Sequence, residues 1–164
     1  MAHVPRPGRV RQIYREEFGS PHRERLFLSS VSFFVTFAVT RIITHAIRAG
    51  AGPFRNLAVG GRHLHHLVFG IIGLLLSGYL WLVQVGVGKR GQDDGLSRAT
   101  SMIYGAGSAL TLDEFALWLN LEDVYWAKQG RESVDAVVLF GGLLSIGLWG
   151  LPFFRSLARE IRRL

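Results

Sequence analysis

Cysteine is absent from the 164-residue chain, and this absence excludes several functions at once. A chain without thiols has no disulfide scaffold, no zinc–thiolate site and no cysteine nucleophile. Charged residues are also scarce, at 19% of positions, whereas 49% of positions are hydrophobic. The mean hydropathy is positive even though the formal net charge is +7. An apolar chain with basic flanks is typical of a membrane protein rather than a soluble domain.

No apolar stretch precedes Leu26, so the sequence predicts an uncleaved first membrane span and no cleavable signal peptide. Four long runs with little or no charge follow, each long enough to cross a hydrocarbon core of roughly 30 Å. These runs are 26–47, 67–88, 99–121 and 136–154. We expect an all-α polytopic membrane protein with three segments: a basic N-terminal arm (1–25), a four-helix transmembrane domain (26–154) and a basic tail (155–164).

Basic residues are distributed unevenly between the two sides of these spans. Thirteen of the 19 Lys and Arg fall in the N-terminal arm, the loop 89–98 and the C-terminal tail, and five fall in the other two loops. The positive-inside rule therefore places both termini in the cytoplasm. The arginines lie at the ends of apolar runs rather than in one stripe. This favours lipid headgroups over nucleic acid as their partners.

Two spans contain charged side chains at a depth where a bilayer makes them costly. Arg41 lies 15 residues into the first span and Asp113 lies 14 residues into the third. At about 1.5 Å per residue, both are roughly 21–22 Å across the membrane. An unpaired charge there costs about 2.5–3.5 kcal/mol even on the most lenient scale. We predict that Arg41 pairs with Asp113 or with the adjacent Glu114, as a counter-ion or anion clamp.

Histidines and further carboxylates gather around this level and toward the outer face. Imidazoles and carboxylates without thiolates suit Zn, Fe(II) or Mn. The predicted metal ligands are His45, His63, His66 and Glu122. Asp113 and Glu114 are the predicted general base or additional ligands, and the residues expected to support the site are His65, Trp118, Asp123 and Asp135. Because His63 and His66 are three residues apart, a continuous helix would place them on one face.

The sequence leaves several functions open for this cluster. A bound divalent metal would activate water to hydrolyse a lipid-like ester or amide. Alternatively, the buried Arg–acid pair fixes helix packing in a non-enzymatic accessory subunit. Intramembrane charges also line ion or proton paths. A b-type haem held by His45 and His66 is a further alternative, but it gives Asp113 and Glu114 no role.

Small residues recur on three of the predicted helices, where they allow neighbouring helices to approach closely. They are Gly70, Gly73 and Gly78, the pair Gly105 and Ala109, and the pair Gly141 and Ser145. We therefore expect a tightly packed bundle.

Three motifs carry a family resemblance. They are HHLVFG at 65–70, ALTLDEFALW at 109–118 and DVYW at 123–126. Together they resemble a family of small prokaryotic four-helix integral membrane proteins with HHxxxG and DEFxLW-type motifs. The resemblance covers fewer than half of the residues. It implies a multi-pass bundle in a prokaryotic membrane and no particular activity. Together with the basic flanks, the sequence predicts a place in the cytoplasmic membrane with lipids as partners, and a second copy or another membrane protein as a further partner.

Overall fold

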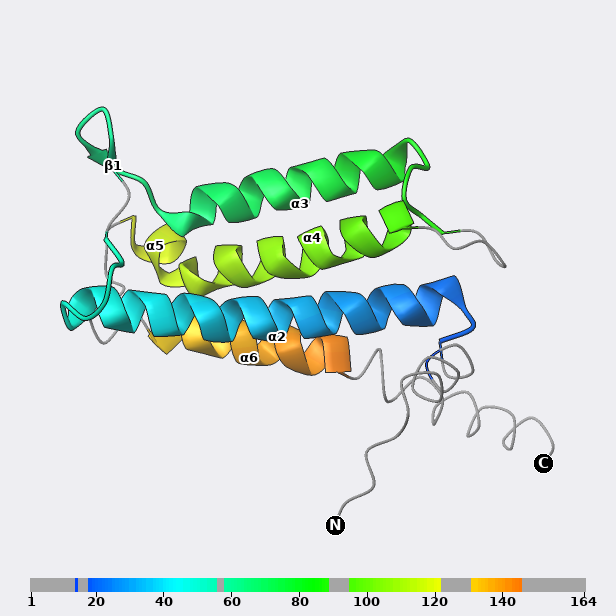
Figure 1. The fold of residues 1–164 in the computed structure, drawn as a ribbon, viewed down its shortest axis with the longest axis horizontal. Coiled ribbons are helices and arrows are strands. Elements are labelled where there is room, and N and C mark those ends of the chain that lie inside the picture. Colours follow the sequence, from blue (N-terminus) through cyan, green and yellow to red (C-terminus); the bar gives the residue numbers. More distant parts are fainter. Residues whose placement is uncertain (1–13, 15–17, 56–57, 89–94, 122–130, 146–164) are drawn as a thin grey trace, which may run out of the picture.

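The computed structural model describes residues 14, 18–55, 58–88, 95–121 and 131–145. Within them the chain forms five helices and one short hairpin (Figure 1). The elements are α2 (Pro21–Arg48), β1 (Ala58–Val59), β2 (Arg62–His63), α3 (His66–Leu82), α4 (Gly95–Asp113), α5 (Phe115–Asn120) and α6 (Arg131–Ser145). The predicted all-α class is confirmed for this part of the chain, where β1 and β2 are only two residues long. The predicted site residues Glu122 and Asp123 lie outside the described residues.

Helix α4 is central, and it packs against α2, α3 and α6. Figure 1 shows α2 and α4 running in one direction and α3 and α6 in the other. We call the end where α2 and α4 finish and α3 begins the network end, and the opposite end the loop end. Helix α2 begins at Pro21, directly after the extended residue Ser20, as expected for proline at a first helical position.

The helices differ in their capacity to cross a bilayer. Among the described residues, α2 is the one helix that is both long and apolar enough to do so. Helix α3 is apolar but has 17 residues. The described part of α6 ends at Ser145, before the end of the fourth predicted run.

Two helices differ in extent from their predicted runs. Helix α3 ends at Leu82, because Gln84, Gly86 and Gly88 adopt positive φ angles that turn the chain back toward α4. The Gly86 carbonyl accepts a hydrogen bond from Thr100 Oγ1 at 3.1 Å, which fixes this turn. The third predicted run, 99–121, is divided between α4 and α5, since Glu114 leaves the helical conformation at φ −110° and ψ 26°.

Glycines bring α4 into backbone contact with two neighbouring helices. A Cβ atom on Gly105 would overlap the Ser29 carbonyl of α2, and one on Gly107 would lie 2.9 Å from the Gly70 carbonyl of α3. These positions therefore require glycine. A Cβ atom on Gly78 would meet nothing within 4 Å. The predicted close approach is confirmed at Gly70 and Gly105 but not at Gly78.

Small polar side chains fill much of the interior, whereas large apolar side chains face outward. The buried hydroxyl residues of the helices are Ser29, Ser30, Thr40, Ser77, Ser97, Thr100, Ser101, Ser108 and Ser133. Ser29 Oγ donates across the interface to the Ser101 carbonyl at 3.0 Å, and so contributes to helix packing. In contrast, Ile42, Leu75 and Leu139 are 66%, 68% and 76% exposed. The buried apolar core is small and centres on Phe33 and Ala109.

Candidate functional site

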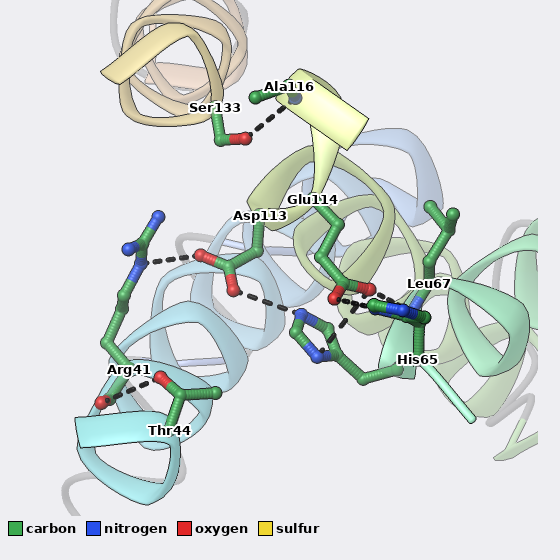
Figure 2. A network of polar contacts seen from close by, with 9 residues as sticks. Arg41, Thr44, His65, Leu67, Asp113, Glu114, Ala116 and Ser133 are labelled. Atoms are coloured by element: carbon green, nitrogen blue, oxygen red, sulfur yellow. Dashed lines mark hydrogen bonds and ion pairs between the residues drawn. The ribbon is translucent and has the colours of Figure 1, made fainter. Parts of the chain in front are cut away.

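Asp113 is the centre of a polar cluster at the network end. Its side chain is fully buried at the last residue of α4. Oδ1 lies 2.6 Å from Nε of Arg41 on α2 (Figure 2). Oδ2 lies 3.0 Å from Nε2 of His66 on α3. The Arg41 contact is an ion pair rather than a well-aligned hydrogen bond. The predicted pairing of Arg41 with the acid pair is confirmed, and Asp113 is the partner.

Glu114 turns its carboxylate toward the start of α3 instead. Oε1 lies 2.8 Å from Nδ1 of His65, and Oε2 accepts a hydrogen bond from the backbone N–H of Leu67 at 2.9 Å (Figure 2). Nδ1 of His66 is 3.7 Å from the same Oε2 atom. Asp113 is the last residue of α4, whereas Glu114 lies at the non-helical junction with α5, and the two carboxylates have different neighbours.

The Glu114–Leu67 bond caps a helix from outside that helix. The first N–H groups of any α-helix have no intrahelical acceptor. Although His65 occupies the N-cap position of α3, its side chain makes no capping hydrogen bond. Glu114 supplies the missing acceptor, and its charge lies near the positive end of the helix dipole. The contact is made at the point where α4 ends and α5 begins.

We define the charge network as Arg41, His65, His66, Asp113 and Glu114. It joins α2 and α3 to the junction of α4 and α5. It contains two carboxyl groups, one guanidinium and two imidazoles. All four carboxyl oxygens contact a nitrogen of this chain within 3.0 Å. His66 lies between both acids, with one ring nitrogen facing each of them.

A separate contact fastens α5 to α6. Ser133 is 1% exposed, and its Oγ accepts a hydrogen bond from the backbone N–H of Ala116 at 2.9 Å (Figure 2). Ala116 is the second residue of α5, so Ser133 satisfies one of the orphan amides of that helix. Nearby, Asn120 Nδ2 donates to Oε2 of Glu132 on α6 at 3.0 Å.

Replacing Ser133 with alanine is expected to destabilise the α5–α6 contact. The variant removes the only side-chain acceptor that the described structure gives to Ala116 N–H, and losing such a cap costs about 1 kcal/mol. The measurement is the free energy of unfolding in detergent micelles. The control is Ser145→Ala, because Ser145 Oγ donates to the Gly141 carbonyl of its own helix. Equal stability of the two variants would contradict the assigned role.

The remaining predicted site residues are not drawn together by the described contacts. His63 lies in β2 rather than on a helix with His66, so the helical-spacing argument does not apply to it, and its side chain is outside the description. His45, Trp118 and Asp135 are exposed. In the part of the chain that the structure describes, no three His, Cys, Asp or Glu side chains are grouped to hold a metal ion.

His65, predicted to support the site, lies directly against one of its carboxylates. It contacts Glu114 itself, although it precedes α3 rather than lying within it. The sequence contained a signal for this arrangement. Two adjacent acids that face different directions need separate partners, and two adjacent histidines provide them.

Comparisons with known proteins give no relative for this chain. No family model matches it, no curated protein matches it, and no solved structure matches it. The similarity of its three motifs to small prokaryotic membrane proteins therefore stays a prediction.

Proposed function

We propose that this chain is a multi-pass membrane protein with four spans and both termini in the cytoplasm, and that it acts as a non-enzymatic accessory subunit. In this proposal the charge network lies near the outer face of the membrane. Its role is to clamp three helices together, rather than to bind a metal or activate water.

The distribution of polarity supports the membrane location. A soluble helical bundle buries its large apolar residues and exposes its polar ones. Here the buried set is rich in serine, threonine and glycine, while Ile42, Leu75 and Leu139 are mostly exposed. In a bilayer, lipid covers such residues, and helices associate through small residues and interhelical hydrogen bonds. Membrane insertion therefore accounts for both halves of the pattern.

The observation that carries the clamp role is the state of the carboxyl oxygens. Each of the four already has a nitrogen partner within the chain, at 2.6 to 3.0 Å. A metal ion or a catalytic water would have to displace one of these contacts. Arg41 also adds positive charge beside Asp113, which disfavours a second cation at that carboxylate. The arrangement suits mutual pairing across helices.

Membrane integration is tested by alkaline carbonate extraction of membranes from cells that produce the chain. We expect the protein to stay in the membrane pellet, because carbonate releases peripheral proteins but not spanning helices.

Reporter fusions after residues 92 and 164 are expected to be cytoplasmic, and a fusion after residue 128 is expected to be external. Release of the chain into the soluble fraction would contradict the membrane proposal.

Elemental analysis of detergent-purified protein distinguishes a clamp from a metal enzyme. We expect no stoichiometric Zn, Fe or Mn, and we expect His66→Ala to lower the thermal unfolding midpoint. One metal ion per chain in the wild type that is lost in His66→Ala would overturn the clamp. That result would favour the metal-dependent hydrolysis of a lipid-like substrate.

A further inference from the structure

A second polar cluster lies at the loop end, where α2 and α4 begin. Glu24 is the one acid that the described residues place there, and it is already engaged. Its Oε1 accepts hydrogen bonds from Tyr14 Oη and from Arg98 Nε, both at 2.8 Å. Burial, together with the Glu24 bond, raises the pKa of Tyr14 to about 12. Glu24 therefore neutralises Arg98.

Arg25 is the neighbouring cation, and no carboxylate within the described ranges contacts it. Its Nη1 donates to the Val87 carbonyl at 2.9 Å, and its Cζ lies 4.6 Å from the ring centroid of Trp81. Its Nε is buried and has no hydrogen-bond partner within the same ranges. Burial lowers the pKa of Arg25, as expected for a cation that is partly removed from water. A half-buried guanidinium with an unsatisfied N–H group and no carboxylate contact within the described ranges favours the binding of an anion.

Hydrogen bonds and close packing hold the groups around Arg25 in place. Trp81 Nε1 donates to Thr100 Oγ1 at 3.1 Å, which holds the indole ring under the guanidinium. A Cβ atom on Gly86 would lie 2.8 Å from Thr100 side-chain atoms, so the loop is closely packed on α4. The Val87 carbonyl that receives Arg25 belongs to this loop. The guanidinium is thus held in place on one ring face and at one nitrogen.

We propose that Arg25 anchors a site for the phosphate group of an anionic phospholipid in the cytoplasmic leaflet. This inference rests on the membrane location proposed above. Arg25 directly precedes the apolar run that begins at Leu26, and Trp81 lies in the last turn of α3. Both residues are therefore at headgroup level, where tryptophan is enriched and where arginine meets lipid phosphate. The planar guanidinium matches phosphate oxygens in charge and in the spacing of its donors.

The experiment compares lipid selectivity in nanodiscs made of phosphatidylcholine alone or of equal parts phosphatidylcholine and phosphatidylglycerol. For the wild type, we expect the thermal unfolding midpoint to rise with phosphatidylglycerol. In Arg25→Gln that rise is lost, and co-purification of phosphatidylglycerol relative to phosphatidylcholine falls about fivefold. The matched control is Arg55→Gln, since Arg55 is exposed, lies beyond the other end of α2 and donates to backbone carbonyls. The control is expected to keep the full rise.

Retention of the full rise by Arg25→Gln would overturn the site. An equal rise produced by inorganic phosphate in detergent would also overturn it, because the ligand would then be a soluble anion. If Arg25→Gln does not fold, Arg25→Lys replaces it. The lysine variant keeps the positive charge, so its thermal unfolding midpoint is expected to rise with phosphatidylglycerol. A lysine variant whose midpoint does not rise would overturn the proposal. Carbonate extraction reports failure of the membrane location separately, before any lipid selectivity is measured.

Discussion

Replacing Asp113 with asparagine is expected to lower the free energy of unfolding by about 3–5 kcal/mol, the cost of breaking a buried ion pair from one side. Asp113 is fully buried and holds both Arg41 and His66. Asparagine keeps the shape but removes the charge, and it replaces one carboxylate oxygen with an NH2 group that cannot accept a hydrogen bond. Arg41, at 20% exposure, would then lose the carboxylate that lies 2.6 Å from its Nε.

A double-mutant cycle separates this pair from its surroundings. Arg41→Gln removes the cation beside the buried Asp113 carboxylate, so this variant is also expected to be strongly destabilised. The double variant is expected to be less destabilised than the sum of the two single variants, with a coupling energy of about 0.5–3 kcal/mol. The measurement is unfolding in mixed micelles, followed by helix content.

Asp135→Asn provides the control for these variants. Asp135 is an exposed acid on α6, so the change is expected to alter stability by no more than about 0.5 kcal/mol. If Asp113→Asn were as stable as Asp135→Asn, the charge network would not be a clamp. Stability that is retained together with loss of a bound metal would point to a ligand role for Asp113 instead.

The Arg41–Asp113 pair could be predicted because only the positions of the two residues along the sequence are needed. Helix rise converts sequence position into depth, and two opposite charges at one depth in neighbouring spans have a strong reason to pair. The same calculation cannot rank Asp113 against Glu114, because adjacent residues differ in depth by only about 1.5 Å. Side-chain direction decided between them, and that direction depends on how α4 is rotated against α2.

The caps made between helices were not predictable from local sequence rules. Capping rules find a side chain that bonds to an amide two or three residues later. Glu114 caps Leu67 at a separation of 47 residues, and Ser133 caps Ala116 at a separation of 17. Each cap requires a partner helix to be in place first. For the same reason the break in the third predicted helix was missed, since an Asp-Glu pair inside an apolar run carries no turn signal.

Glycine spacing predicted that helices approach closely but not which helices meet. Gly105 contacts α2, whereas Gly107, two residues away and on a different side of α4, contacts α3. A single glycine-rich segment thus serves two interfaces. This arrangement explains how α4 packs between two neighbours without large side chains. It also means that substitutions of glycines that look alike in the sequence disturb different helix interfaces.

Gly105→Ala is therefore expected to be among the most disruptive small substitutions in the chain. Its Cβ atom would overlap the Ser29 carbonyl, a backbone atom that moves only if α2 moves. Separation of the two helices would also strain the hydrogen bond from Ser29 Oγ to the Ser101 carbonyl. We expect the free energy of unfolding to fall by about 3 kcal/mol, which is at the upper end of the range for overpacking. The measurement is again unfolding in micelles.

The matched control, Gly78→Ala, makes the same chemical change on α3, where a Cβ atom meets nothing within 4 Å. Because alanine favours a helix over glycine, this variant is expected to gain about 0.5–1 kcal/mol. The two alanine variants should therefore move stability in opposite directions. Similar stability in both would show that the backbones of α2 and α4 do not meet at Gly105. The alignment that brings Arg41 to Asp113 would then need another cause, since this contact fixes α2 against α4 along the same interface.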